Sequence, residues 1–565
     1  MNPSTNYTEG INGNLQAGPG WFRDHSGLWM VLILFLMVVC LVDPLREMAI
    51  DDDWAYALTV RHLLETGEYR LHDWATANMI VQVYWGALFS KVFGFSFAAL
   101  RISSLFLFGF GLAALYALLR DRGSSNHEAG LLTLALLSSP LVVRMGFTFM
   151  TDVQFLAWLI ISLWLYARAF SKRSKLIVVL ASMAAAAAIG TRQFGMAMLA
   201  GLCAAWAFDR ERLRRTGLYA LGMLLPTVTA LWQLRSGFTH PTFYMSINLK
   251  RQSAFVGDVG EFMIEFLWRV TAALQYLGLF LLPLMLLLAW SAWTSKSNPA
   301  PKVHRWVGGA WLGYILAGVI YGYAGKRVLM PSLLWNLDIL KANFVLMVIL
   351  TVATSVFAVL IGWTLSMRAF TRQFWTSTQP TEVFLAVTAA TMLGFHLVYV
   401  DFGDEYLISF LPFVILVFRR FIGHWRIKKK WLAIVISLIL LTLSGLWTRS
   451  TLELEEELWK SADRLRAQGI LPKEIYGSWT WSCYHAAFQE WLEEVEGKPM
   501  TDPGAFFTTW LPQREREARY RIVHSANAPA GITWKAIEKL TYRDMWLQRR
   551  CLFVVEQQNP DQIRK

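Results

Sequence analysis

Long apolar runs recur along most of this chain, and they constrain its fold more than any other feature. Six of them approach or reach the roughly 20 residues that a helix needs to cross a bilayer: Leu28–Leu45, Phe97–Leu119, Val153–Phe170, Leu274–Trp290, Phe344–Trp363 and Trp431–Leu446. Of the 565 residues, 55% are hydrophobic and only 16% are charged, which is unlike an ordinary soluble enzyme. The pattern predicts an all-α polytopic membrane protein with about 13 transmembrane helices.

The charged residues indicate how such a chain is oriented. The net charge is +13, but Lys and Arg sit in short loops between apolar runs rather than on one basic face, so nucleic acid is not an expected partner. The clusters are Arg120 and Arg122; Arg168 to Lys175; Arg210 to Arg215; Lys296 to Arg305; Arg368 and Arg372; and Arg419 to Lys430. They fall in alternate loops, which the positive-inside rule assigns to the cytoplasm. An odd number of spans then places the C-terminus outside.

The chain divides into three parts by composition. Residues 1–26 are mostly polar and are expected in the cytoplasm, and the first apolar run is expected to remain as a helix because no cleavage site follows it. Residues 27–447 form the predicted membrane domain. Its outer loop, 46–96, contains two stretches of helical spacing, Trp54–Leu64 and Met79–Val92, predicted to lie on the outer membrane surface.

Beyond Trp447 the composition becomes charged and mixed, which predicts a small extracytoplasmic αβ domain over residues 448–565. A helix is expected at Leu452–Gln468, and strands are expected at Arg519–His524 and Cys551–Glu556. Cys483 and Cys551 form a candidate disulfide in an oxidising compartment, although sequence alone does not place their Cβ atoms within reach.

Acidic residues at the outer ends of spans are the first candidates for chemistry. Asp51, Asp52 and Asp53 follow the first span and open a surface helix, where acids also complement a helix dipole. Asp152 follows another span, where an N-cap role is the alternative. Carboxylates from two spans of an otherwise apolar chain are able to converge on one cavity as a base, an orienting group or metal ligands.

Basic residues on the same side complete the candidate site. Arg192 interrupts two nearly continuous spans, and an ionisable group near membrane depth usually faces protein or a water-filled cavity. Arg101 stands near the start of its span, and Lys326 and Arg327 lie in an outer loop. For Arg101 an interfacial anchoring role is the alternative. The chain contains no P-loop, Cys-x-x-Cys, Gly-x-Ser-x-Gly or His-Glu-x-x-His motif.

These motifs resemble those of the GT-C membrane glycosyltransferases, especially the lipopolysaccharide-core sugar transferases, aminoarabinose transferases and protein O-mannosyltransferases. The resembling segments are Asp52-Asp53-Trp54-Ala55-Tyr56-Ala57 with Leu63–Gly67 and Tyr69; Tyr84-Trp85-Gly86-Ala87-Leu88; Phe93-Gly94 with Ala99–Ser103; Thr191–Gly195; and Asp404–Leu407 with Leu411-Pro412. The resemblance is strong over residues 45–200 and patchy to about residue 425. Two departures stand out, since Ile80–Val83 replaces the family's Pro pair and Glu405 stands where an Arg is common.

The resemblance implies roles for individual residues. Asp52 takes the position of the catalytic acid, Asp53 that of its acidic neighbour and Asp152 that of the second loop acid. Arg192 takes the position of a residue that binds the carrier phosphate. Substrate-binding residues are expected to include Tyr56, Tyr84, Arg101, Arg192, Lys326, Arg327 and Tyr406. A divalent cation is left open, and Asp52 and Asp152 are its candidate ligands.

The implied activity is transfer of a sugar from a polyprenyl-phosphate carrier to a glycan, lipid or protein acceptor, with inversion at the anomeric carbon. The expected location is the bacterial inner membrane, with the site and the C-terminus outside. A transporter or flippase of a lipid-linked saccharide is the main alternative, because it would also carry many spans and outer carboxylates. A non-catalytic partner in envelope assembly is the third hypothesis.

Overall fold

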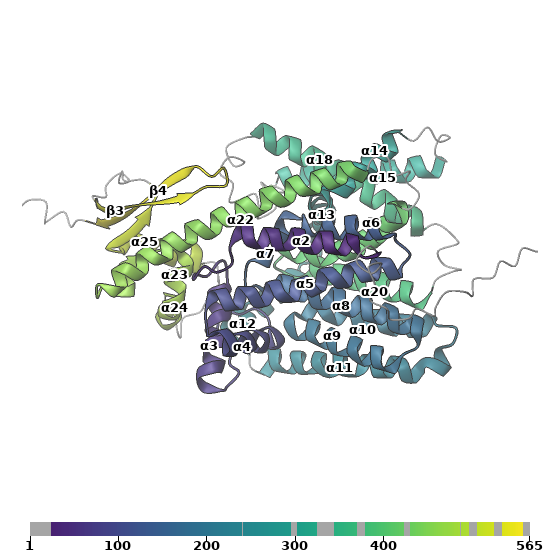
Figure 1. The fold of residues 1–565 in the computed structure, drawn as a ribbon, viewed down its shortest axis with the longest axis horizontal. Coiled ribbons are helices and arrows are strands. Elements are labelled where there is room, and N and C mark those ends of the chain that lie inside the picture. The colour runs from purple at the N-terminus through teal and green to yellow at the C-terminus, as the bar shows by residue number, and fades with distance from the viewer. Residues whose placement is uncertain are drawn as a thin grey trace, which may run out of the picture.

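The protein is a mostly helical bundle with a small sheet near its C-terminus, as the computed structural model shows (Figure 1). The structure describes residues 24–239, 241–294, 302–324, 344–369, 379–422, 430–485, 487–495, 505–524 and 534–557. Lys326 and Arg327 lie outside these described residues.

The first half of the chain builds the densest part of the bundle. Its helices are α2 (Ser26–Val42), α3 (Asp53–Thr66), α4 (Ile80–Phe93), α5 (Phe97–Asp121), α6 (Asn126–Leu137), α7 (Pro140–Gly146), α8 (Thr151–Lys172), α9 (Lys175–Thr191), the 3₁₀ turn η1 (Gln193–Met196), α10 (Ala197–Phe208) and α11 (Arg212–Thr239). Close packing of α5 on α8 requires Gly111, because a Cβ there would lie 2.9 Å from the Cα of Ala157. Helix α3 ends at Gly67, whose φ of 73° is the left-handed conformation typical of a helix C-terminus.

The second half adds further helices and the C-terminal region after residue 448, which we name the outer domain for its predicted location. The helices are α12 (Phe243–Gly257), α13 (Val259–Phe280), α14 (Leu282–Thr294), α15 (Lys302–Ala324), α18 (Phe344–Ala369), α20 (Pro380–Val398), the 3₁₀ turn η2 (Glu405–Phe410), α21 (Leu411–Ile422) and α22 (Lys430–Ala467). Figure 1 shows α2, α5, α8 and α11 running across the bundle, while α3, α4 and the sheet lie at one end of it.

The C-terminal segment forms a four-stranded sheet with short helices. Its elements are β1 (Ile475–Tyr476), α23 (Trp479–Tyr484), α24 (Ala487–Val495), the π-helical turn η4 (Phe506–Trp510), α25 (Leu511–Glu517), β2 (Tyr520–Val523), β3 (Trp534–Arg543) and β4 (Arg549–Gln557), with the 3₁₀ turn η3 (Pro472–Glu474) before β1. The strand order is β1-β2-β4-β3, with β1 parallel to β2 and the other pairs antiparallel.

The structure does not confirm the predicted number of spans. Five helices within the described residues are long and apolar enough to cross a membrane, and two bent helix pairs would raise the number to seven. Further apolar helices of 10–17 residues, such as Lys175–Thr191 and Gln193–Phe208, are shorter than one crossing. The predicted count of about 13 is not confirmed, because hydropathy does not show where an apolar run breaks into shorter helices.

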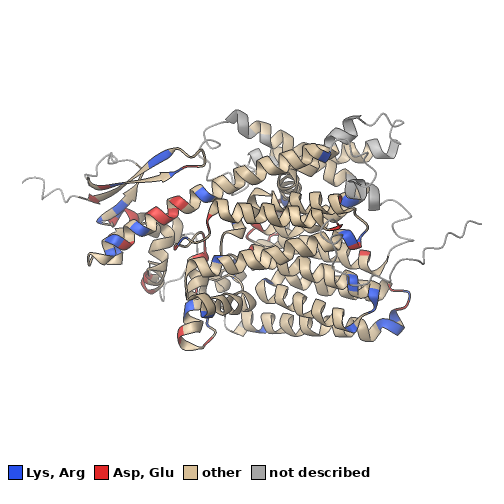
Figure 2. Cartoon of the chain, viewed as in Figure 1, with Lys and Arg blue, Asp and Glu red and all other residues tan. Residues whose placement is uncertain are grey.

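Ion pairs show that the cationic loops meet at one end of the bundle. Arg168 pairs with Asp121, and Arg173 pairs with Glu211. Further pairs join Arg122 to Glu382 and Lys430 to Glu128. Figure 2 shows Lys and Arg gathered at the end of the bundle opposite α3 and α4. The predicted charge asymmetry is therefore present between the two ends, and the acidic triplet lies at the less cationic one.

The outer domain is docked on the loop that precedes the acidic triplet. Arg46 pairs with Glu453 at 3.3 Å and with Glu456 at 2.5 Å, both on α22. Helix α22 runs without a break through the predicted domain boundary at residue 448. The four cysteines, all within the described residues, are free, so the structure does not contain the candidate Cys483–Cys551 disulfide.

Candidate active site

The three acids of the triplet point to three different partners. The backbone of Asp51 is left-handed, with φ of 51°, and its carboxylate accepts hydrogen bonds from Arg144 at 3.0 and 3.1 Å. Asp52 accepts from the indole Nε1 of Trp74 at 2.8 Å. Asp53 is buried and accepts from the backbone N–H of Phe149 at 2.8 Å. Only Asp52 combines an accessible surface with a neutral hydrogen-bond donor.

Asp52 has the electrostatic properties of a general base. It lies among protein atoms at the N-terminus of α3 but is not fully buried. Burial raises the pKa of Asp52 to about 6, and the charges of Asp51 and Asp152 act in the same direction, while the Trp74 hydrogen bond opposes them. A carboxylate with a pKa close to the working pH is a better proton acceptor than one with an ordinary value.

Trp74 is held by an aromatic cluster that the outer domain completes. Its ring centroid lies 4.9 Å from that of Tyr244 and 5.0 Å from that of Phe488. Phe506 and Phe507 approach it at 5.8 and 5.3 Å. Three of these four rings come from beyond residue 448, so the domain that follows α22 helps to fix the donor to Asp52.

Arg192 and the buried Asp152 form an ion pair at the N-terminal end of α8. Arg192 lies at the break after α9, where its own backbone is extended, and it donates through Nη1 to Asp152 Oδ1. Its guanidinium lies 4.3 Å from the ring centroid of Tyr406, a distance typical of a cation–π contact. The other carboxylate oxygen, Asp152 Oδ2, is buried without a hydrogen-bond partner among the described residues.

Tyr56, on α3, is influenced electrostatically by both Asp52 and this ion pair. Its side chain is buried, and burial raises its pKa; the charges of Asp52 and Asp152 act in the same direction and Arg192 acts against them. The phenol therefore lies within electrostatic reach of all three groups. Of the predicted site residues, the structure brings Asp52, Tyr56, Asp152, Arg192 and Tyr406 together.

Two of the predicted site residues lie elsewhere. The guanidinium of Arg101 is buried and donates to the carbonyl oxygens of Phe147, Pro44, Arg46 and Met48 at 2.7–3.0 Å. It therefore ties the loop before the triplet to the loop before α8. The other, Tyr84, is 51% exposed and stacks on Tyr69 at a centroid distance of 6.1 Å.

A cavity of about 400 Å³ adjoins the Arg192 side of the site. Its lining includes Tyr406 and Glu405, the residue that departs from the family pattern. Burial and the neighbouring charges of Asp404 and Asp152 raise the pKa of Glu405 well above its ordinary value.

The sequence did not single out Trp74 or Tyr244. Trp74 donates to the base, and Tyr244 packs against its ring. A chain with 27 Trp residues gives no signal that distinguishes one indole in a loop from the others. Within the described residues there is no group of three or more His, Cys, Asp and Glu side chains that could hold a metal ion, so no step is assigned to a metal.

Comparison with known proteins identifies a relationship for part of this site. Residues 79–232 match the family model described as dolichyl-phosphate-mannose-protein mannosyltransferase. The chain is similar to GT-C polytopic membrane glycosyltransferases. This confirms the resemblance predicted from the sequence. The matched segment contains Asp152 and Arg192 but neither Asp52 nor Tyr406.

Solved structures of similar proteins come from a bacterium and an archaeon. ArnT from Cupriavidus metallidurans in the apo state has 15% identity and a TM-score of 0.41, with 95% of this chain and 98% of that chain covered. The same protein bound to undecaprenyl phosphate has 14% identity, a TM-score of 0.41 and the same coverage. AglB, an oligosaccharyltransferase from Archaeoglobus fulgidus in complex with an inhibitory peptide and a dolichol-phosphate, has 12% identity and a TM-score of 0.41, with 79% of this chain and 58% of that chain covered. No curated protein sequence matches the chain.

Proposed function

We propose that this protein transfers a sugar from a polyprenyl-phosphate carrier to an acceptor on the extracytoplasmic side of a bacterial inner membrane. One observation carries the proposal. Asp52, with a pKa raised to about 6, stands in one buried cluster with an arginine that Asp152 and Tyr406 hold in place. The cluster therefore offers a proton acceptor and a cation, which are the two groups that displacement of a phosphate from a sugar requires.

The proposed reaction is a single displacement. An acceptor hydroxyl oxygen attacks the anomeric carbon, the bond from that carbon to the phosphate oxygen breaks, and Asp52 takes the hydroxyl proton. The electron pair of the broken bond stays on the polyprenyl phosphate, whose negative charge Arg192 stabilises. Attack on the face opposite the phosphate inverts the anomeric configuration without a covalent enzyme intermediate.

Asp152 and Tyr406 position Arg192 rather than react. Their ion pair and cation–π contact restrict the guanidinium to one place, so little reorganisation is needed when charge develops on the leaving phosphate. The unpartnered Asp152 Oδ2 is available to accept a hydrogen bond from a sugar hydroxyl. Together these contacts assign donor binding to the Arg192 side of the cluster and acceptor activation to Asp52.

The proposal is tested by supplying the full chain, purified in nanodiscs, with radiolabelled polyprenyl-phosphate hexoses and pentoses. Total envelope glycolipid and envelope protein serve as acceptors. The expected result is label transferred to an acceptor, with the opposite anomeric configuration in the isolated product by NMR. A result that would contradict the proposal is no transfer with any donor, together with movement of a lipid-linked sugar across reconstituted vesicles, which would favour the transporter.

A further inference from the structure

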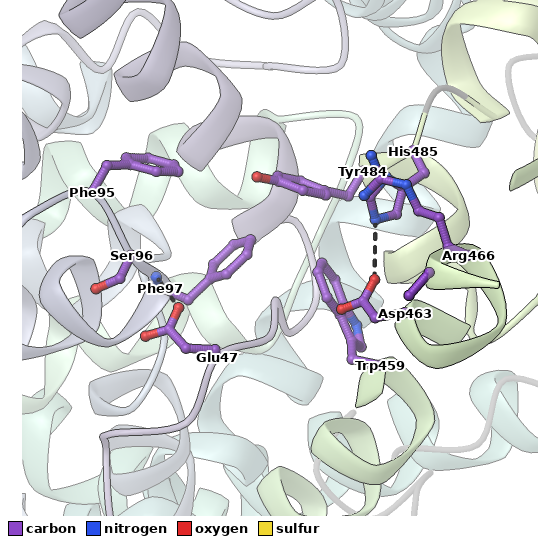
Figure 3. A pocket seen from close by; sticks show the side chains of 10 residues that line it. Glu47, Phe95, Ser96, Phe97, Trp459, Asp463, Arg466, Tyr484 and His485 are labelled. Atoms are coloured by element: carbon purple, nitrogen blue, oxygen red, sulfur yellow. Dashed lines mark hydrogen bonds and ion pairs between the residues drawn. The ribbon is translucent and has the colours of Figure 1, made fainter. Parts of the chain in front are cut away.

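A second cavity, of about 500 Å³, lies at the seam between the membrane bundle and the outer domain. It is lined by the start of α5, the end of α22 and α23, and its volume is within the range of small-molecule sites in proteins. Figure 3 shows Phe97, Trp459 and Tyr484 gathered around it, with Asp463 and His485 beside them. We refer to it as the seam groove.

Three aromatic rings of the seam groove are fixed against one another. The ring centroids of Phe97, Trp459 and Tyr484 lie 5.3–5.4 Å apart in each pair. Trp459 Nε1 donates to the Thr480 hydroxyl at 3.0 Å, and the Tyr484 hydroxyl accepts from Arg61 at 3.1 Å. Since packing and hydrogen bonds already hold these rings, binding of a ligand would carry little entropy cost for ordering them.

The charged side chains of the seam groove that are open to a ligand are those of Asp463 and Arg466. Asp463 accepts from Trp481 Nε1 at 2.9 Å and lies 3.7 Å from His485 Nε2, and both contacts are to Oδ1. The side chain of Arg466 is exposed and forms no hydrogen bond or ion pair with the described residues. The third charged group, Glu47, is occupied, because it accepts from the backbone N–H groups of Phe97 and Ala98.

This combination fits a sugar ring better than other ligands. A pyranose presents hydroxyls that both donate and accept hydrogen bonds, and an apolar C–H face. Phe97 and Trp459 are buried, so the partly exposed rings of Phe95 and Tyr484 are the ones available to pack on that face. Asp463 is able to accept from one hydroxyl while Arg466 donates to another. A lipid chain would leave both charges unpaired, and a phosphate would face Asp463 as well as Arg466.

We propose that the seam groove binds one sugar ring of a glycan acceptor, an inference that rests on the proposed function for the identity of its occupant. Tyr484 lines the groove, whereas its neighbour Cys483 lies within electrostatic reach of Asp52. Successive residues of a helix point about 100° apart, so one face of α23 lines the groove and a different face is directed toward Asp52. The sugar ring of the acceptor that occupies the groove is therefore remote from the sugar ring that is glycosylated. It contributes binding energy at a distance from the reaction.

Binding is measured without donor, on the full chain in nanodiscs. The probes are fluorescently labelled tetrasaccharides of glucose, galactose, mannose and N-acetylglucosamine, followed by anisotropy. At least one of them is expected to bind, with a Kd raised about tenfold or more by Asp463→Asn and by Arg466→Gln. The matched control is Arg464→Gln, which lies on the same helix and loses an exposed ion pair to Glu538 at 2.9 Å and a hydrogen bond to the Ser461 hydroxyl at 3.1 Å. Its Kd is expected to change by less than about twofold.

Two results would overturn the proposal. One is that no probe binds, or that both variants bind with the wild-type Kd. The other is that vesicles of phosphatidylglycerol, rather than any tetrasaccharide, bind in a manner that Arg466→Gln abolishes.

A transfer assay separates failure of the groove from failure of the proposed function. If transfer occurs and the acceptor KM is the same in wild type and both variants, the groove proposal alone fails. If the variants lose saccharide binding but no donor supports transfer in the wild type, the proposed function fails and the groove stands as a saccharide site.

Discussion

At the scale of single residues, the decisive contrast is among Asp51, Asp52 and Asp53. They are chemically identical and adjacent, yet one binds an arginine, one binds an indole and one binds a backbone amide. The indole-bound acid keeps part of its surface accessible, and burial raises its pKa to about 6. Environment rather than residue type therefore distinguishes Asp52, the proposed base, from its two neighbours.

Replacing Trp74 by Phe removes the hydrogen bond to Asp52 and keeps a ring in the aromatic cluster. The bond stabilises the ionised carboxylate, so its loss raises the pKa of Asp52 further. Activity falls as the pH drops through that pKa, because a protonated Asp52 is not a base. The acidic limb of kcat/KM is expected near pH 6 in the wild type and higher by roughly one unit in Trp74→Phe.

Trp54→Phe is the matched control for this change. Trp54 lies 5.7 Å from Trp74 between ring centroids, and its Nε1 has no hydrogen-bond partner among the described residues. The acidic limb of kcat/KM in Trp54→Phe is expected at the same pH as in the wild type. The same limb in all three proteins would mean that another group controls the pH dependence.

Arg192→Gln tests whether the positive charge of Arg192 contributes to the rate of transfer. The substitution removes the charge opposite the leaving phosphate and leaves Asp152 without its ion pair. A loss of about 10²–10³-fold in kcat/KM is expected, with part of it restored in Arg192→Lys. A steady-state titration of the donor measures both parameters. Wild-type kinetics in Arg192→Gln would remove Arg192 from the mechanism.

At the scale of elements, loops are placed by buried polar groups that hydropathy does not reveal. Arg101 was expected to bind substrate because it stands near the outer end of a span. In the structure its guanidinium donates to four backbone carbonyls from two loops. Sequence gives the position of such an arginine along the chain but not the carbonyls that surround it.

Arg101→Gln is therefore expected to destabilise the protein. The variant leaves buried carbonyl oxygens without donors, which costs on the order of 3 kcal/mol. The apparent melting temperature in detergent should fall by several degrees, whereas Lys91→Gln, an exposed change on α4, should leave it unchanged. An unchanged melting temperature in Arg101→Gln combined with a raised donor KM would instead support the predicted substrate-binding role.

The secondary structure of the C-terminal region was predicted only in part. The two expected strands correspond to β2 and β4, because each has a short run of apolar and β-branched residues. Strand β3 was missed since its side chains are mostly exposed and mixed in character. The helix predicted at Leu452–Gln468 is the end of α22, which is rich in Glu, Lys, Arg and Leu and therefore continues through the change in composition.

At the scale of the whole molecule, charge separates the two ends of the bundle. At one end, arginines of the cationic loops form ion pairs with acidic residues of neighbouring loops. The acidic triplet and the outer domain lie at the other end (Figure 2). The sequence predicted this asymmetry because loop charge needs no knowledge of packing. It did not predict that the outer domain would complete the aromatic cluster around Trp74, since contacts between distant segments leave no local pattern.

Thiol labelling tests the orientation that we propose. In a variant with Cys40 and Cys203 replaced by Ala, Cys551 is partly exposed and Cys483 is buried. A membrane-impermeant maleimide is expected to label Cys551 in intact spheroplasts. When Arg214→Cys is added in the cationic loop, that residue should react only after lysis. Labelling of residue 214 in intact spheroplasts would place the cationic end outside and contradict the orientation.

We propose that Asp52 accepts the proton of the acceptor hydroxyl during sugar transfer. A comparison of the activity of Asp52→Asn with that of the wild type tests this role. Asn keeps the size of the side chain and removes the basic oxygen. Asp43→Asn serves as the control, because Asp43 lies at the C-terminal end of α2, shortly before the triplet, and Asn tolerates its positive φ of 62°. If Asp52 is the base, kcat is expected to fall by about 10²-fold or more in Asp52→Asn and to keep its wild-type value in Asp43→Asn. Equal turnover in all three proteins would contradict it.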